Sequence, residues 1–326
     1  MKTFEYRTAT AASAVLAPDA AFLAGGTNLV DLMKLGVATP DVLVDVTKLP
    51  LDRITDLPDG GLRVGATVRN SDLAADPRIR ERYPVLSQAL LAGASGQLRN
   101  MATTGGNLLQ RTRCTYFMDP STPCNKRAPG SGCPARAGDH RNLAILGGSE
   151  ACIATHPSDM AVALAALGAQ VRVESATGER TIAVTELHRL PGDRPDLDTV
   201  LDHGEMITAV DLPALPFATR SAYRKARDRA SYAFAVGSVA AALDVADGLV
   251  RDVRLAWGAV APRPWRATTA ERLLRGRPAT HENFLAAADE ELRAARPLRD
   301  NAYKTTLTRN LTAAVLTRLA SAGEAR

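Results

Sequence analysis

The sequence predicts an α+β protein made of two domains, and three features of the chain carry this prediction. Residues 21–36 contain a short apolar run, a glycine pair and an amphipathic helix in direct succession. Residues 110–150 are crowded with proline and glycine, which interrupts the regular pattern. Beyond Pro216, three strand-like segments precede a long helical region rich in Ala, Leu, Arg and Glu. Because strands followed by helices are typical of a separate α+β unit, we expect one domain over 1–216 and a second over 217–326.

The first domain is expected to open with a strand, a tight turn and a helix. Ala21–Leu23 forms the expected strand and Gly25-Gly26 the turn. Thr27 or Asn28 can cap the helix, and Gly36 ends it. The further elements expected in this domain are strands at 41–49, 61–70, 169–174, 179–184 and 205–213 and helical structure at 71–93 and 158–167.

The second domain is expected to begin with three antiparallel strands, at 220–229, 238–248 and 248–262. Asp247-Gly248 is a strong hairpin signal, because both residues tolerate the positive φ angles of a two-residue turn. From Thr268 onward the pattern is mostly helical.

Composition excludes several classes of protein. Hydrophobic residues make up 46% of the chain and aromatic residues 4%, which predicts a packed core built mainly from Ala, Val and Leu. The net charge of +5 comes from scattered arginines without a Lys/Arg block, so we expect no nucleic-acid partner. The chain shows no apolar window of about 18 residues and no signal-peptide pattern, so we expect no membrane insertion and no export signal of its own.

Two glycine pairs flanked by threonine and asparagine are candidate phosphate sites. Gly25 and Gly26 precede Thr27-Asn28 in the first glycine turn (25–28), and Thr104-Gly105-Gly106-Asn107 forms the second (104–107). Backbone N–H groups at such turns can approach an anion because glycine has no side chain in the way. Neither turn matches G-x-G-x-x-G or a P-loop, and each can also be a helix-start turn that binds nothing. Together they could hold the two phosphates of one dinucleotide from two sides.

All four cysteines of the chain lie in one proline- and glycine-rich stretch, the cysteine loop (110–152). They are separated by nine, eight and eighteen residues, without a C-x-x-C pair, which argues against a zinc ribbon or a thioredoxin site. A loop this long inside a compact domain needs an interaction that fixes it in place. Thiolates from a loop that wraps around an iron–sulfur cluster can provide one. Structural zinc and buried free thiols are the alternatives, with His140 and His156 as possible further ligands. The candidate ligands are Cys114, Cys124, Cys133 and Cys152.

No catalytic constellation is evident in the sequence. The chain has five histidines, in neither a Ser/His/Asp order nor an H-E-x-x-H motif. A protein that only moves electrons needs no general base, so we expect no catalytic side chain.

Three segments together resemble the FAD-binding subunits of molybdenum hydroxylases, the family of xanthine dehydrogenase, carbon monoxide dehydrogenase and aldehyde oxidoreductases. They are AGGTNLVDLMK (24–34), ATTGGNLLQ (102–110) and HPSDM (156–160), and with the C-terminal block the resemblance covers nearly the whole chain. The segment QRTRCTYFMDPSTPCNKRAPGSGC (110–133) is most similar to the FAD/[4Fe–4S] subunits of bacterial periplasmic aldehyde oxidoreductases.

The resemblance implies a fold and a set of cofactor contacts. The fold would be a two-lobed FAD-binding domain of the vanillyl-alcohol-oxidase (PCMH) type, with lobes at about 1–55 and 56–216, and a C-terminal domain of the CO dehydrogenase flavoprotein type. Asp159 would hold the adenosine part of FAD, Ile207 would contact the ring by its backbone and Lys225 would lie near the isoalloxazine. Tyr116 and Tyr232 are candidates to cover the flavin. The implied FAD contacts are Ala24, Gly25, Gly26, Thr27, Asn28, Leu29, Thr104, Gly105, Gly106, Asn107, Leu109, Asp159, Ile207 and Lys225, and the four cysteines would ligate a [4Fe–4S] cluster.

The resemblance also implies an electron-transfer role within a heterotrimer. Substrate would be oxidised at a molybdenum cofactor in a large subunit, and [2Fe–2S] clusters of a small subunit would pass the electrons to FAD in this chain and on to an external acceptor. The chain would be periplasmic by export with a signal-bearing partner, and otherwise cytoplasmic. The alternatives are a stand-alone flavin-dependent reductase on the same fold and a zinc-stapled scaffold subunit that is not an enzyme.

Overall fold

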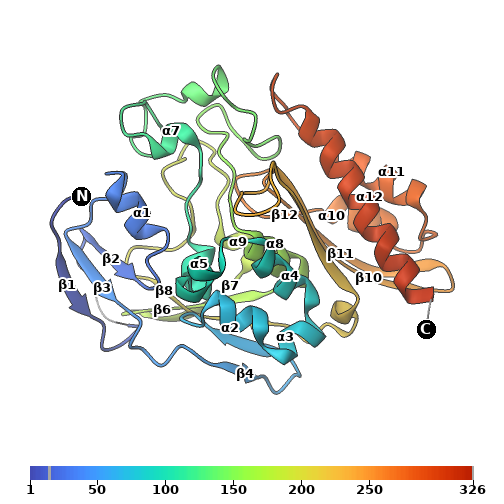
Figure 1. Ribbon diagram of the computed structural model, residues 1–326, viewed down its shortest axis with the longest axis horizontal. Coiled ribbons are helices and arrows are strands. Elements are labelled where there is room, and N and C mark those ends of the chain that lie inside the picture. Colours follow the sequence, from blue (N-terminus) through green and yellow to red (C-terminus); the bar gives the residue numbers. More distant parts are fainter. Residues whose placement is uncertain (14–15, 325–326) are drawn as a thin grey trace.

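Three β-sheets, each drawn from its own stretch of the sequence, organise the computed structural model, which describes residues 1–13 and 16–324 (Figure 1). The first sheet is parallel, with the order β1-β3-β2. Helix α1 crosses over between β2 and β3, as parallel neighbours require. Its elements are β1 (Glu5–Thr8), β2 (Ala20–Leu23), α1 (Leu29–Lys34) and β3 (Val42–Asp45).

The second sheet is antiparallel, with the order β4-β5-β8-β6-β7. Its central strand β8 buries Met206, Ile207, Ala209, Val210 and Leu212, and forms part of the main core together with the surrounding helices. The strands are β4 (Ile54–Asp56), β5 (Leu62–Gly65), β6 (Gln170–Ser175), β7 (Gly178–Ala183) and β8 (Met206–Leu212).

The helical region predicted at 71–93 is divided into three short helices. Pro77 and Pro84 each begin a new helix, because proline suits a first turn but cannot continue a preceding one. The helices between β5 and the end of the first domain are α2 (Asn70–Ala75), α3 (Pro77–Arg82), α4 (Pro84–Ala92), α5 (Gly96–Met101), α6 (Thr104–Leu108), α7 (Thr115–Met118), α8 (Asp159–Leu167) and α9 (Val184–Leu187), with short 3₁₀ turns at Pro134–Arg136 and Pro216–Thr219.

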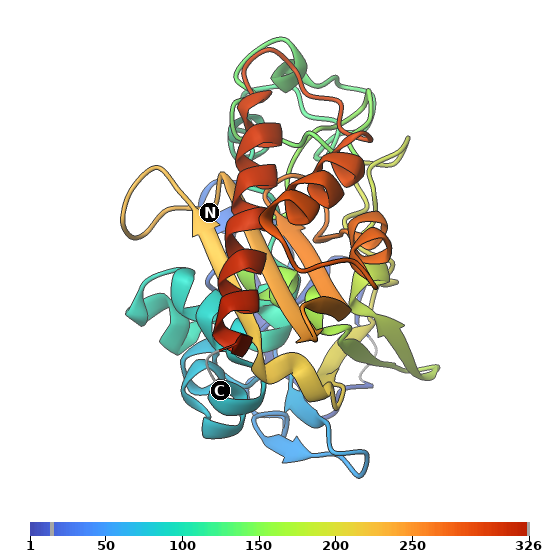
Figure 2. The ribbon, with the colours of Figure 1, turned by 90° about the vertical axis from the view of Figure 1, so that its right-hand side faces the viewer.

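The third sheet, of order β12-β11-β10-β9, is antiparallel and is covered on both faces. Helix α12 lies across one face, with α10 and α11 beside it (Figure 2), while α4 and α8 pack on the other. Burial on both faces explains why Val239–Leu243 is a continuous apolar run and does not alternate. The elements are β9 (Ser221–Ala226), β10 (Gly237–Ala246), β11 (Leu249–Gly258), β12 (Trp265–Arg266), α10 (Thr268–Leu274), α11 (His281–Leu292) and α12 (Tyr303–Glu324).

The predicted hairpin turn at Asp247-Gly248 is confirmed, since both residues have positive φ angles, 54° and 73°. The strand expected at 61–70 ends early, at Gly65. A Cβ on Gly65 would lie 2.1 Å from the carbonyl oxygen of Leu51, so the chain leaves the strand where two backbones touch. Strand β1 was not expected, because its four residues are all exposed and show no apolar alternation.

The cysteine loop contains little regular structure, as its proline and glycine content predicts. It contacts the second domain (Figure 1). The Lys304 ammonium donates to the carbonyl oxygens of Asn142 and Ala259, at 2.8 and 2.7 Å. The Asn301 side chain donates to the carbonyl oxygen of Ala144 at 3.2 Å. Burial lowers the pKa of Lys304 to about 7. Two buried side chains, one just before α12 and one in its first turn, therefore hold residues 142–144 of the loop in place.

None of the described helices has the length and apolar character needed to cross a membrane.

Candidate functional site

The structure brings the two glycine turns together. A Cβ on Gly25 would lie 1.8 Å from the carbonyl oxygen of Met101 and 3.2 Å from the Cα of Ala102. Only glycine permits this contact, because any side chain would occupy the same space as the neighbouring backbone. The first turn therefore packs directly against the segment that leads into the second, as a shared dinucleotide site requires.

The first glycine turn offers hydrogen-bond donors without partners. Among the described residues, no acceptor pairs with the backbone N–H groups of Gly25, Gly26, Thr27 or Asn28. The Asn28 side chain accepts from the backbone N–H of Arg111 at 2.9 Å, while its buried Nδ2 has no partner within the described part of the chain. Buried amide donors are rarely left unpaired. These donors fit an anionic group such as the pyrophosphate of FAD.

The second glycine turn uses its donors internally. The N–H groups of Thr104 and Gly105 donate to the carbonyl oxygens of Val68 and Ala66, at 2.9 and 2.8 Å. Thr103 caps α6, and its hydroxyl accepts from the N–H of Gly106 at 3.3 Å. Most of the N–H groups that we expected to bind phosphate at this turn are therefore already hydrogen-bonded within the protein, although Gly106 itself is exposed.

Two further predicted FAD contacts lie beside the second turn. A Cβ on Gly105 would lie 3.7 Å from the Cβ of Ile207, so this buried strand residue packs against the turn. The Asn107 side-chain oxygen accepts from the Ser158 hydroxyl at 2.6 Å, which ties the start of α8 to the turn. The remaining predicted contacts in the two turns are Ala24 and Leu29, which flank the first, and Leu109, which is exposed after the second.

Asp159 and Lys225 form one nearly buried ion pair, with 2.8 Å between carboxylate and ammonium and side-chain exposures of 9% and 4%. The Tyr223 hydroxyl donates to the same carboxylate at 2.5 Å. Burial and this negative charge raise the pKa of Tyr223 well above its ordinary value. The cap of α8 is Ser158, whose hydroxyl accepts from Ala161, so Asp159 is not needed as a cap. The resemblance assigned Asp159 and Lys225 to different parts of FAD, whereas the structure places their charged groups in contact.

The two tyrosines considered as flavin covers lie in different surroundings. Tyr116 lines the cysteine pocket described next, and its hydroxyl accepts from the backbone N–H of Asp139 at 2.8 Å. Tyr232 is exposed on the β9–β10 loop with a φ of 51°.

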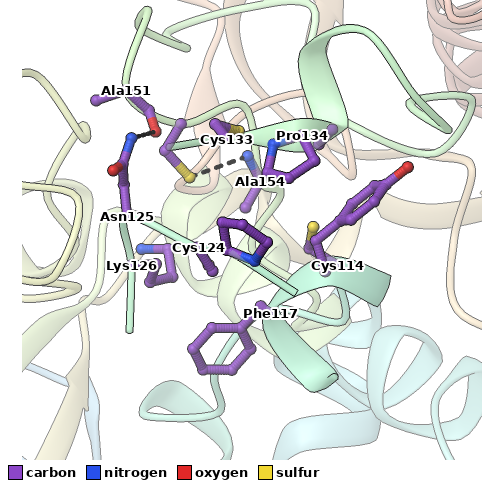
Figure 3. Close-up of a pocket in the computed structure, with 13 residues that line it drawn as sticks. Cys114, Phe117, Cys124, Asn125, Lys126, Cys133, Pro134, Ala151 and Ala154 are labelled. Atoms are coloured by element: carbon purple, nitrogen blue, oxygen red, sulfur yellow. Dashed lines mark hydrogen bonds between the residues drawn. The ribbon is translucent and has the colours of Figure 1, made fainter. Parts of the chain in front are cut away.

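All four cysteines line a single pocket, together with Phe117, Lys126 and Pro134 (Figure 3). All four are free thiols; Cys114 and Cys152 are buried, and Cys124 and Cys133 are partly exposed. Burial raises the pKa of the Cys114 thiol to about 11 and also raises the pKa of Cys133 and Cys152. Burial therefore favours the protonated form of these three thiols.

The pocket between the thiols is small, about 10 Å³, which is room for about one water molecule. Within residues 1–13 and 16–324, no group of three or more His, Cys, Asp or Glu side chains is arranged to hold a metal ion. The expected gathering of the cysteines is thus present, whereas a [4Fe–4S] cluster is not shown.

The two histidines considered as additional ligands are engaged by the backbone. His140 accepts from the N–H of Asp300 at 3.0 Å, so its other nitrogen donates to the carbonyl oxygen of Ala135 at 3.2 Å. In His156, one ring nitrogen accepts from Ser158 and the other meets the carbonyl oxygen of Leu108, both at 3.4 Å. Burial lowers the pKa of His156 well below its ordinary value. Both histidines therefore have structural roles.

Sequence reasoning missed a second pocket, which adjoins the second glycine turn. It is lined by residues 108–112 and 154–156 with Lys126, His188 and Asp198, and measures about 30 Å³. The Nε2–H of His188 donates to the carbonyl oxygen of Leu108, 2.8 Å away. The residues that line this second pocket are far apart in the chain, so no local sequence pattern indicated the pocket.

Comparison with protein families assigns both parts of the chain. The family described as the FAD binding domain in molybdopterin dehydrogenase matches residues 4–215. The CO dehydrogenase flavoprotein C-terminal domain matches residues 221–319. The predicted combination of these two domain types is confirmed, and the boundary predicted after Pro216 lies between the two matched regions.

Individual relatives span almost the whole chain. The aldehyde oxidoreductase FAD-binding subunit PaoB of Escherichia coli (strain K12) is 51% identical over 323 residues, covering 97% of this chain and 98% of that protein. The carbon monoxide dehydrogenase medium chain of Hydrogenophaga pseudoflava is 27% identical, covering 87% of this chain and 82% of that protein. A solved structure of carbon monoxide dehydrogenase from the same organism matches with a TM-score of 0.76 and 25% identity, covering 98% of this chain and 97% of that one.

Proposed function

The chain belongs to the FAD-binding subunits of the molybdenum hydroxylases, and on this premise we propose that it is the flavin- and cluster-bearing electron-transfer subunit of an aldehyde oxidoreductase. The observation that carries the aldehyde assignment is the 51% identity over 97% of the chain to the E. coli aldehyde oxidoreductase subunit. FAD supplies two-electron and one-electron redox chemistry when it is bound. The chain's own residues would hold the cofactor, orient it and supply no general acid or base.

The first glycine turn would hold the pyrophosphate of FAD. Its support is that, within residues 1–13 and 16–324, the N–H groups at 25–28 and the buried side-chain amide of Asn28 have no hydrogen-bond partner. The second turn would contribute shape, because Gly105 allows Ile207 and Ala66 to pack closely against it. The buried pair of Asp159 and Lys225 would offer one charged contact point, held in place by Tyr223.

The cysteine loop would hold a [4Fe–4S] cluster. The support is that four unpaired thiols, from positions spread over 39 residues of sequence, surround one pocket. Four zinc-bound sulfurs lie about 2.3 Å from a single point, whereas the thiolates of a cluster bind separate iron atoms. Within the described residues the four thiols are not arranged around a single ion position, which favours the cluster over zinc, and cluster binding would widen the pocket and displace the thiol protons.

We further propose that a molybdenum-cofactor large subunit and a [2Fe–2S] small subunit complete a heterotrimer. Electrons would arrive from the [2Fe–2S] clusters and leave for an external acceptor. The naming of a relative as a medium chain supports a multi-subunit assembly. Export to the periplasm would depend on a partner subunit that carries a signal peptide. Cell fractionation tests this, and we expect the intact complex in the periplasmic fraction.

Spectroscopy of the intact complex, purified without oxygen, tests the cofactor content. We expect one FAD per chain, an absorption band of a [4Fe–4S] cluster and, after reduction, a cluster EPR signal beyond those of the [2Fe–2S] centres. Zinc without flavin would support the scaffold alternative. Substrate-dependent flavin reoxidation by the isolated chain would support the stand-alone reductase.

A further inference from the structure

Three charged residues lie between the two pockets, and we call them the charge bridge: Arg111, Lys126 and Asp198. Lys126 lines the cysteine pocket and also the second pocket beside Leu108 and Leu109. Arg111 and Asp198 line the second pocket only, and the backbone N–H of Arg111 donates to Asn28 in the first glycine turn. The bridge thus connects the surroundings of the four thiols with the proposed FAD site.

The contacts within the bridge leave an excess of positive charge. The Lys126 ammonium donates to one oxygen of Asp198 at 2.5 Å and to the carbonyl oxygen of Pro195 at 2.7 Å. The Arg111 guanidinium donates to the other oxygen of Asp198, also at 2.5 Å. Burial by itself would raise the pKa of Asp198, but the two cations together hold it below its ordinary value. Two cations therefore share one carboxylate, which leaves one net positive charge.

Lys126 differs from the other cations of the cysteine loop. Arg113 pairs with Asp31 and Arg136 with Glu150, at 2.8 and 2.9 Å. Arg127 donates to backbone carbonyl oxygens of the loop itself. Lys126 is 9% exposed and is the charged side chain that lines the cysteine pocket.

We propose that Lys126, held by Asp198, is the residue that raises the reduction potential of the [4Fe–4S] cluster in this subunit. This inference rests on the proposed function. Reduction adds one electron to a centre that four thiolates already make negative, and a nearby buried cation stabilises the added charge. Asp198 partly neutralises that cation, so the two residues set the potential in opposite directions. Lys126 would act on the cluster through its positive charge and would not be one of its ligands.

The test is an EPR-monitored redox titration of the cluster in the intact complex, with iron, sulfide and FAD measured in each sample. We expect Lys126→Met to shift the midpoint potential to more negative values and Asp198→Asn to shift it to more positive values. The matched control is Lys126→Arg, which keeps the charge and should stay nearest to wild type. Full iron content with unchanged potentials in both Lys126→Met and Asp198→Asn would overturn the proposal.

Loss of the cluster has defined consequences. If Lys126→Met lacks iron, the sign of the shift in Asp198→Asn decides, and a shift to more negative values contradicts the proposal. Iron loss in all three variants, including Lys126→Arg, would overturn it by showing a purely structural role. A wild-type complex with FAD and without the additional iron would instead refute the cluster assignment of the proposed function, which is a different result from an unchanged potential.

Discussion

In the part of the chain that the structure describes, the backbone N–H groups of the first glycine turn have no acceptors, whereas in the second turn those of Thr104 and Gly105 donate to the carbonyl oxygens of Val68 and Ala66. In sequence the two look alike, since each is a Gly-Gly pair with Thr and Asn beside it. The first turn lies between a parallel strand and helix α1, while the second forms the beginning of α6 and lies alongside the segment after β5. The difference teaches that a glycine pair permits close approach but does not by itself provide donors. Anion binding is therefore expected at the first turn, while the second turn would only shape one side of the FAD site.

The largest effect is expected at the point where the turns touch. Gly25→Val would place side-chain atoms inside the backbone of Met101, so we expect a loss of about 3 kcal/mol of unfolding free energy and of all bound FAD. The matched control is Gly96→Ala, where a Cβ would meet no atom within 4 Å. Denaturant unfolding and flavin content measure both. A Gly25→Val protein with normal stability would contradict the observed contact.

Iron binding and FAD binding are expected to be separable, because the cysteine loop and the glycine turns are different sites. Cys124→Ser removes one thiol from the cysteine pocket while leaving both turns unchanged, so we expect loss of the iron signal with most of the FAD retained. Iron, sulfide and flavin assays on the purified complex check this. Full iron content in the variant would reject Cys124 as a ligand, and loss of FAD together with iron would show that the two sites fold as one.

The third prediction compares the asparagines of the two turns. Asn28→Asp keeps the oxygen that accepts from Arg111 but replaces the unpaired amide donor by a negative charge, so we expect FAD binding to weaken by about 10–100-fold. Asn107→Asp keeps the oxygen that accepts from Ser158 and serves as its counterpart in the second turn. Flavin titration of the stripped protein gives both affinities. An equal or larger loss in Asn107→Asp would break the proposed difference between the turns.

The smallest effect is expected at the exposed face of the second turn. A Cβ on Gly106 would meet only the Thr103 hydroxyl, at 3.0 Å, so Gly106→Val should fold with a loss of about 1 kcal/mol. Because its N–H is already bonded to Thr103, we expect FAD affinity to fall by no more than about tenfold. Thermal unfolding and flavin titration test both parts. A folded variant without any FAD would show that the cofactor presses directly on this turn.

Local patterns were sufficient for much of this molecule. The glycine turns, the Asp247-Gly248 hairpin and the absence of long helices from the cysteine loop follow from the conformational limits of glycine and proline. The order of motifs was sufficient for the family. The exposed strand β1 escaped prediction because none of its residues is buried, so it has no apolar pattern to detect.

What escaped prediction at the site depends on contacts between distant parts of the chain. Whether a turn has free donors depends on acceptors such as Ala66 and Val68, almost 40 residues before the second turn. The ion pair of Asp159 with Lys225 joins residues 66 apart, and that of Lys126 with Asp198 joins residues 72 apart. A charge pattern along the sequence gives no sign of which pairs the fold will bring together.

The fastening of the cysteine loop by Asn301 and Lys304 has a consequence for biosynthesis. The ribosome delivers the loop long before it delivers these two side chains, because chains are made from the N-terminus. Until residues 301–304 have emerged, the contacts of these two side chains with 142–144 cannot form. Maturation of this subunit thus includes an interval in which the four thiols are already made but this part of the loop is not yet held, and synthesis of residues 301–304 ends it.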